Sequence, residues 1–166
     1  MSADPEVMEF FPEPLSRKES DHVIARIQAH QEKYGFCFFA AEVIGNAAFI
    51  GFVGIQHVPF KARFTPAVEI GWRLARRYWN RGLATEAAQA VLNYSFQTLK
   101  LEEVVSYAVS GNMRSRRVME KINMRHDHAG DFDHPLLPVG HSLRRHVLYR
   151  LRRSEWRTLQ QRATAE

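Results

Sequence analysis

The sequence has almost no cysteine and no long hydrophobic run, and both shortages limit what the chain can be. One cysteine, Cys37, occurs in 166 residues, so an internal disulfide is excluded and a reducing, cytoplasmic compartment is expected. No run of about 18 apolar residues is present, which argues against a transmembrane helix. The stretch from Met1 to Glu6 is acidic and has no apolar segment, so no secretory signal is predicted.

Metal-binding spacings are missing as well. Five histidines lie close together in the sequence, at His126, His128, His134, His141 and His146. None of their separations is the helical His-x-x-x-His spacing, and a single cysteine cannot form a Cys-x-x-Cys pair. We therefore expect no functional metal, and structural or substrate-contacting roles for these imidazoles.

Positive charge is in excess. The net charge is +5, and seven arginines lie between Arg144 and Arg162. Such a surface attracts nucleic acid or a small ligand that carries several phosphates. Because no zinc-finger spacing or RNA-binding aromatic motif is present, nucleic acid is not the expected partner. Basicity alone does not decide between the two.

The composition is typical of a globular domain. Hydrophobic residues make up 45% and charged residues 25% of the chain, which is enough for a sizeable core. No internal repeat or linker is visible, so we expect one domain over residues 1–166. Cys37 lies in an apolar run and is expected to be a small buried hydrophobe.

The most informative stretch reads as a strand, a turn rich in arginine and glycine, and a long helix. Apolar residues alternate from Val68 to Leu74, as in a half-buried strand. They recur every three or four positions from Ala84 to Leu99, as in an amphipathic helix. The free N–H groups at a helix start attract phosphate, and Gly82 leaves the approach open. Three arginines add charge around the turn: Arg76, Arg77 and Arg81.

This stretch resembles the acetyl-coenzyme A signature of the GNAT N-acetyltransferases. The segment Arg-Gly-Leu-Ala-Thr-Glu-Ala begins at Arg81 and follows Glu-Ile-Gly-Trp-Arg-Leu, which begins at Glu69. The likeness is closest to the RimJ/RimL-like branch, which includes the ribosomal-protein N-terminal acetyltransferases, and it extends from about Asp4 to Trp156. Three further segments occur in the right order: Asn112-Met-Arg-Ser, Phe132-Asp-His-Pro and His146-Val-Leu-Tyr.

The resemblance implies an α+β fold: a mixed, mostly antiparallel twisted sheet with a splayed parallel strand pair and flanking helices. Periodicity and capping signals predict a helix from the Ser16–Glu19 capping box to Gly35 and a hairpin of strands 36–43 and 48–57 around a turn at 44–47. A loop at 58–66 precedes the central strand, and Gly51 and Gly54 suggest a bulge or a close backbone approach. Later elements are expected as strand 104–109, a helix from Asn112 to Ile122, strands 125–132 and 145–151, and a terminal helix capped by Ser154.

By this resemblance, acetyl-CoA would lie between the splayed strands. The backbone of Trp72, Arg73 and Leu74 would bond the pantetheine arm as an added strand would, and Asn112 would bind it from the other side. The pyrophosphate would be held by Arg77, Trp79, Asn80, Arg81, Gly82, Leu83, Ala84 and Thr85.

Acetyl transfer to an amine needs a base for the ammonium proton, and an acid assists departure of the thiolate. Glu69 is the candidate base; the alternatives are a water relay, or an ion pair of this carboxylate with Arg73 or a loop arginine. Ser115 is the candidate acid; the alternative is a hydroxyl bonded to a carbonyl one turn back. Tyr107 is a weaker candidate acid, because a strand tyrosine is more often core with a wet tip.

Two departures from the family pattern affect these expectations. Trp79 replaces the Gln or Arg of many relatives, so phosphate binding would depend more on backbone groups and Arg81. The usual first strand is absent ahead of the first helix, so a sheet edge is either left bare or covered by a partner chain or the C-terminal segment. We therefore expect a homodimer.

Two classes of function remain. The first is an acetyl-CoA-dependent N-acetyltransferase acting on a primary amine, either a protein N-terminus or a small molecule. An acidic acceptor pocket would favour cationic small molecules, and an open groove would favour a peptide end. The second is a non-catalytic module that binds RNA or the ribosome through its basic C-terminal face.

Overall fold

The computed structural model describes residues 1–45 and 48–163. The strands are β1 (Phe38–Glu42), β2 (Phe49–His57), β3 (Val68–Leu74), β4 (Glu103–Val109), β5 (Arg125–His126), β6 (Phe132–Asp133) and β7 (Arg145–Arg152). The helices are α1 (Arg17–Tyr34), α2 (Leu83–Asn93), α3 (Met113–Lys121) and α4 (Arg153–Ala163), with helical turns η1 (Arg76–Tyr78), η2 (Tyr94–Thr98) and η3 (His128–Gly130). None of the helices in the described part of the chain has both the length and the apolar character needed to cross a bilayer.

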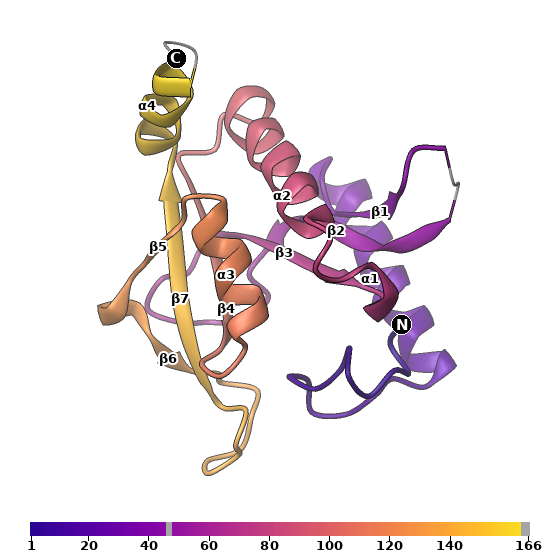
Figure 1. Ribbon diagram of the computed structural model, residues 1–166. Coiled ribbons are helices and arrows are strands. Elements are labelled where there is room, and N and C mark those ends of the chain that lie inside the picture. The colour runs from indigo at the N-terminus through magenta and orange to yellow at the C-terminus, as the bar shows by residue number, and fades with distance from the viewer. Residues whose placement is uncertain (46–47, 164–166) are drawn as a thin grey trace.

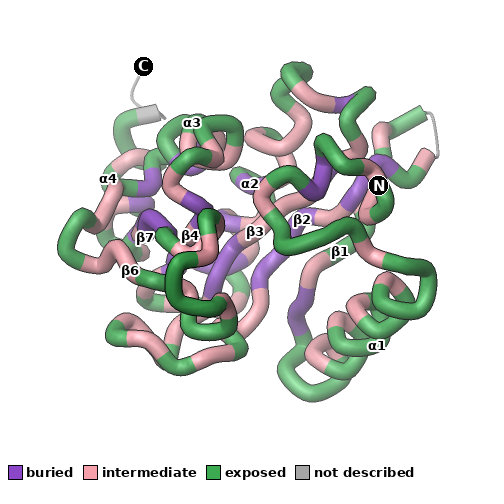
Figure 2. The backbone as a smooth tube through the Cα atoms, turned by 90° about the horizontal axis from the view of Figure 1, so that it is seen from below, coloured by how far each residue is buried: buried purple, intermediate pink, exposed green. Residues whose placement is uncertain are grey.

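The strands form one mixed sheet with helices on both faces. The hydrogen-bonded order is β1-β2-β3-β4-β7-β5, and β6 pairs with β7. Figure 1 shows α2 and α3 in front of this sheet and α1 behind it, and the view from below in Figure 2 agrees. The main core lies between the sheet and α2, where Ala88 and Leu92 pack with Ile70 and Leu74. The expected α+β arrangement is therefore confirmed, and the first strand of the chain follows α1.

The first helix has the predicted ends. The Ser16 hydroxyl accepts the Glu19 N–H, the Glu19 carboxylate accepts the Ser16 N–H, and Gly35 closes the helix at φ 78°. Cys37 follows, buried as expected, and its burial raises the pKa of the thiol.

The hairpin of β1 and β2 is also present. Its turn was predicted at 44–47; Ile44 and Gly45 form a turn, and residues 46 and 47 lie outside the described residues. A Cβ added at Gly51 would lie 2.1 Å from the Arg73 carbonyl oxygen, and one at Gly54 would lie 2.2 Å from that of Cys37. The close backbone approach predicted for these glycines is confirmed.

The parallel pairing of β3 with β4 is confirmed, and it is brief. Within the described residues this ladder consists of Glu69 opposite Val105, and the Ser106 hydroxyl then donates to the Ile70 carbonyl at 2.9 Å. Figure 1 shows the two strands diverging beyond this point. Within the described residues, the edge of β3 from Gly71 to Leu74 therefore has no strand paired with it on its β4 side.

Two predicted elements are wrong in detail. The continuous strand expected over 125–132 is broken into β5, η3 and β6, because Asp127 accepts the Gly130 N–H at 3.0 Å and turns the chain. The last helix begins at Arg153, directly after β7, so Ser154 is not its cap; the Glu155 carboxylate accepts the Arg152 N–H at 3.1 Å instead. The helix predicted to end near Leu99 does so through η2, a π-helical turn.

Candidate cofactor and acceptor site

The start of α2 is open to an anion. Its N-cap is Gly82, whose φ of 77° favours glycine, and no side chain caps the first turn. A Cβ built on Gly82 would have no atom within 4 Å. Leu83, Ala84 and Thr85 follow and are half-buried. Their backbone N–H groups and the positive end of the helix dipole suit a diphosphate.

Two arginines beside this helix start contact the same aromatic ring. The guanidinium carbons of Arg77 and Arg81 lie 4.9 and 5.8 Å from the centre of the Tyr78 ring, which is buried. Between them Asn80 takes a left-handed conformation at φ 56°. Sequence reasoning missed Tyr78, although a tyrosine between arginines in a predicted phosphate turn was a usable signal.

Trp79, at the end of η1, contacts residues of both β3 and α3. Its indole N–H donates to the Leu74 carbonyl at 2.8 Å, and the ring packs against the core. Its other neighbour is the Arg114 guanidinium, 4.5 Å from the ring centre. Trp79 therefore fixes the end of β3 relative to α3, rather than presenting a polar group in the manner of Gln or Arg.

Asn112 caps α3 on the far side of the gap. Its side-chain oxygen accepts the Ser115 N–H at 3.1 Å. That bond uses the carbonyl oxygen of the amide and leaves the two N–H donors for a ligand. Ser115 itself is half-buried, and its hydroxyl forms no hydrogen bond with any described residue. The alternative of a hydroxyl bonded to a carbonyl one turn back is thus not seen.

Arg73 is a half-buried cation with unused donors. Its Nε and Nη1 atoms are buried without a hydrogen-bond partner among the described residues. The guanidinium carbon lies 4.0 Å from the centre of the Phe11 ring and 5.3 Å from that of Phe52, and burial lowers the arginine pKa to about 10. Sequence analysis placed only the backbone of Arg73 in the site, and the contact with Phe11 from the N-terminal segment could not be foreseen.

Glu69 is buried on the face of β3 opposite the main core. The Gln56 side-chain amide donates to it at 2.5 Å, and Tyr107 also interacts with its carboxyl group. Burial raises the pKa of Glu69 to about 7 and that of Tyr107 far above its ordinary value. No ion pair in the described structure includes Glu69, so the alternative of a pairing with Arg73 is not seen. Gln56 was missed, because it lies opposite Glu69 in the β2–β3 ladder, a pairing that the sequence analysis did not predict.

Tyr107 and the five rings around it form what we call the ring cluster on this same face: Phe60, Phe64, Tyr107, Phe132, His134 and His146. Ring centres are 4.6 Å apart for Phe60 and His134, and 5.7 Å apart for Tyr107 and Phe132. Burial lowers the pKa of His134 to about 4 and also lowers that of His146, so both imidazoles are neutral. The loop at 58–66 supplies Phe60 and Phe64.

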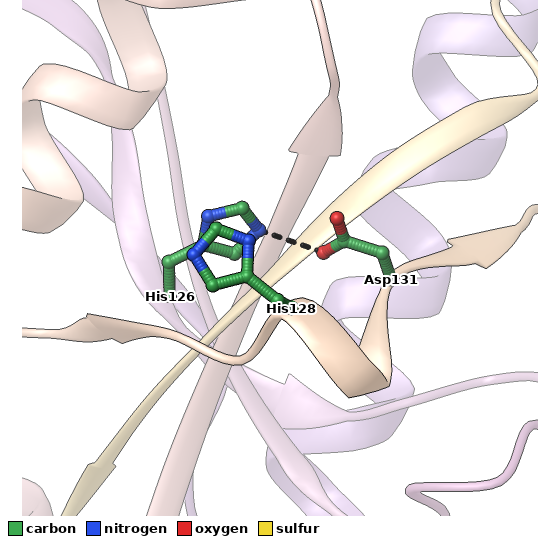
Figure 3. A group of neighbouring side chains, drawn as sticks. All are labelled: His126, His128 and Asp131. Atoms are coloured by element: carbon green, nitrogen blue, oxygen red, sulfur yellow. Dashed lines mark hydrogen bonds and ion pairs between the residues drawn. The ribbon is translucent and has the colours of Figure 1, made fainter.

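A second histidine group, shown in Figure 3, is separate from the ring cluster. His126, His128 and Asp131 each offer a donor atom, all within 4.8 Å of one another. His126 Nε2 and an Asp131 oxygen are 2.8 Å apart, and that oxygen also accepts the Leu148 N–H at 3.0 Å. These bonds join the segment from β5 to β6 to β7, so the group has a structural role.

Several features of the site suit acetyl-CoA. The space at Gly82 is open, the first turn of α2 is uncapped, and Arg73 has orphaned donors. The unpaired edge of β3 and the amide of Asn112 offer partners for a ligand that contains amide groups. Glu69 and the ring cluster lie on the sheet face opposite α2 and α3.

Comparison with known proteins gives the same picture. The sequence profile of an acetyltransferase (GNAT) domain matches residues 1–125. The uncharacterized N-acetyltransferase YnaD of Bacillus subtilis is 28% identical over 158 residues, covering 93% of this chain and 85% of that protein. A GNAT-family acetyltransferase structure from Bacillus anthracis is 28% identical with a TM-score of 0.73, covering 93% of this chain and 86% of the other.

A more distant structure shares the fold. Spermidine N-acetyltransferase from Vibrio cholerae, in complex with CoA and spermine, aligns with a TM-score of 0.71 at 17% identity, covering 93% of this chain and 87% of that one. The profile match covers most of this chain, and the sheet has the expected parallel pair. The chain therefore belongs to the GNAT family in its RimJ/RimL-like branch and is an N-acetyltransferase, of a family that uses acetyl-CoA.

Proposed function

We propose that this chain transfers the acetyl group of acetyl-CoA to a primary amine, with Glu69 as the base and Ser115 as the acid. The observation that carries the proposal is the position of Glu69. It is a buried carboxyl group with a pKa of about 7, at the last paired residue before β3 and β4 diverge. Proton abstraction from an ammonium requires a carboxyl group whose pKa is close to the working pH. Glu69 meets this requirement next to the unpaired edge of β3, which suits the cofactor.

The binding roles follow from the described contacts. The N–H groups of Leu83, Ala84 and Thr85, with Arg77 and Arg81 beside them, would hold the pyrophosphate. The backbone from Trp72 to Leu74 would pair with the pantetheine arm, and the Asn112 amide would donate to it from the other wall. When bound, acetyl-CoA supplies a thioester carbonyl for attack by the amine.

The proton steps use two side chains. Glu69, held by Gln56 and Tyr107, takes the ammonium proton and frees the nitrogen lone pair. As the C–N bond forms and the C–S bond breaks, the Ser115 hydroxyl would give its proton to the departing sulfur and be reprotonated by the second proton that leaves the amine nitrogen. A backbone N–H on β3 would stabilise the developing oxyanion.

The contrasting function, RNA or ribosome binding through the basic C-terminal face, has less support. Arg150 is paired with Glu103 at 2.6 Å and with Asp127 at 2.7 Å. Arg153 is paired with Glu102 at 2.8 Å. Such pairing neutralises part of the charge that a phosphate backbone would need.

Acetyl-CoA turnover over a panel of amines tests the proposal. The panel should contain small amines and peptides with different first residues, and Ser115→Ala should slow the chemical step. CoA affinity at moderate salt, measured beside RNA affinity across a salt series, provides the contrast. Strong, salt-dependent RNA binding with no CoA binding would replace the enzymatic proposal with the binding module.

A further inference from the structure

The ring cluster is a surface feature and not part of the main core. Its three phenylalanines, Tyr107 and His134 are half-buried, and His146 is the sole fully buried member. None of the three phenylalanines packs with the core around α2. Aromatic side chains left half-exposed together on one face mark a binding surface more often than chance.

The cluster is continuous with the proposed base. Tyr107 interacts with the Glu69 carboxyl group through its hydroxyl and contacts Phe132 through its ring, with centres 5.7 Å apart. Phe64 approaches Phe132 from the loop on the other side, at 5.0 Å. An amine held at Glu69 would therefore have its substituent against these rings.

The charges beside the cluster do not suit a second cation on the acceptor. Glu69 is linked to the cluster through Tyr107, and Asp133 follows Phe132 in β6. Glu69 is partly protonated at neutral pH, and Asp133 is 3.4 Å from Arg144 and 3.6 Å from Arg145. Lys61, in the loop between Phe60 and Phe64, is exposed and adds positive charge. Among the described residues, Glu69 is thus only partly charged and Asp133 is paired with arginine, so neither offers a free carboxylate to a second ammonium group of a polyamine.

We infer that the acceptor is a primary amine carried by an aromatic or bulky apolar group, and that this group packs against Phe132 and its neighbouring rings. The inference rests on the proposed acetyl transfer. Offset or edge-to-face contact with the rings stabilises such an acceptor beyond the burial of its apolar area. The amine comes from a small arylalkylamine or from a peptide with an aromatic first residue; both present the same group to the cluster.

Steady-state kinetics with matched acceptors tests the inference. The acceptors are phenethylamine, n-butylamine and putrescine, with Phe-Gly-Gly and Gly-Gly-Gly as the peptide arm. We expect kcat/KM for the aromatic member of each arm to exceed that of its partners by about tenfold or more. Phe132→Ala should lower this preference about tenfold through KM of the acceptor, with KM for acetyl-CoA unchanged. Phe64→Ala, in a loop, gives a second reading if Phe132→Ala folds poorly.

Phe39→Ala is the matched control, because it removes an exposed phenylalanine on β1, outside the ring cluster. It should leave the preference unchanged. Preference for putrescine, or the same aromatic preference in Phe132→Ala and Phe64→Ala, would overturn the inference while leaving acetyl transfer intact. If Phe132→Ala changes the protein from dimer to monomer in light scattering without changing KM for the acceptor, the rings belong to an interface between two copies, and the inference is equally overturned.

Calorimetry separates failure of the inference from failure of the function. Absence of CoA binding would remove the proposed function itself. If CoA binds, phenethylamine should bind the CoA-loaded protein more tightly than putrescine. Failure of phenethylamine to bind would reject the inference alone.

Discussion

Glu69 occupies an environment that sets the pH at which it can accept a proton. Because burial raises its pKa to about 7, the ionised form is a minority below that pH and the majority above it. We therefore expect kcat/KM to rise with pH and to level off above about 7. Glu69→Gln should lower kcat by about a hundredfold or more and abolish this rise, while affinity for CoA is retained.

Glu32→Gln is a suitable control for this rate measurement, because Glu32 is an exposed residue of α1. It should preserve both the rate and its pH dependence. A pH profile that is the same in wild type and Glu69→Gln would show that another group, such as an ordered water, accepts the proton.

The burial of Glu69 also has a cost in stability. Between the ordinary pKa of 4.5 and the folded value of about 7, the unfolded chain releases this proton and the folded chain retains it. This residue therefore makes the protein less stable as pH rises through that window. Glu69→Gln should increase the free energy of unfolding at pH 8, by up to about 3 kcal/mol, and have little effect at pH 4.5. Urea denaturation at both values measures the difference; an equal effect at both would contradict the role of burial.

Gly82 has no side chain where the proposed pyrophosphate would lie. Gly82→Trp should weaken CoA binding by more than tenfold in calorimetry, because the indole fills the open space at the start of α2. Gly45→Trp is a matched control: Gly45 also has a left-handed φ, of 85°, and nothing within 4 Å of its Cβ position. If both variants lose CoA affinity equally, backbone strain is responsible and not the filling of the space at the start of α2.

Single residues were predictable where a local pattern carried the information. Glu69 and Gly82 follow from strand alternation and from the turn before a helix. The roles of Phe11 and Phe132 depend on contacts between segments far apart in the chain, at Arg73 and Tyr107 respectively. No local periodicity specifies such contacts, so the environment of the proposed acceptor had to come from the structure.

At the scale of elements, the start of α3 combines a structural and a binding role in one side chain. Asn112 caps the helix with its oxygen and has amide donors to spare. Asn112→Ala should lose both functions: about 1 kcal/mol of stability and several-fold in CoA affinity. Asn112→Ser retains a capping oxygen without the amide, so we expect near wild-type stability with reduced CoA affinity.

Thermal melting and calorimetry on the two variants separate these roles. If Asn112→Ser binds CoA as well as wild type does, the amide makes no contact with the cofactor and Asn112 is a helix cap alone. Equal melting temperatures for all three proteins would instead argue that the cap is dispensable.

Element boundaries were predictable where capping residues are unambiguous, as at Ser16 and Gly35. The strand expected over 125–132 failed because Asp127 competes for backbone N–H groups through its side chain, a choice that the apolar pattern does not reveal. The start of α4 was misplaced for a related reason: Glu155 reaches back to the Arg152 N–H and replaces the cap expected from Ser154.

At the scale of the whole molecule, the N-terminal segment forms ion pairs with both η1 and α3. Glu6 is paired with Arg76 of η1 at 2.7 Å, and Glu9 is paired with Arg114 of α3. Val7 and Met8 between them are buried. Segments on either side of the sheet gap are thus connected through residues that precede α1, an arrangement that only the assembled chain displays.

The sheet itself ends in an unpaired strand, because within the described residues β1 has β2 as its one neighbour. Phe39 on β1 is 42% exposed and Phe49 opposite its end is 54% exposed. An apolar edge of this kind is a template for pairing with another chain, and we propose that it joins two copies. Light scattering should then give twice the monomer mass of 19.2 kDa, and Phe39→Lys should shift the protein toward monomer by placing a charge at the edge. Leu136→Lys, which alters an apolar residue 71% exposed in the β6–β7 loop, should leave the dimer intact. A concentration of about 100 μM is well above the dissociation constant of a stable dimer. A monomeric mass for the wild type at that concentration would show that the edge is in contact with solvent instead.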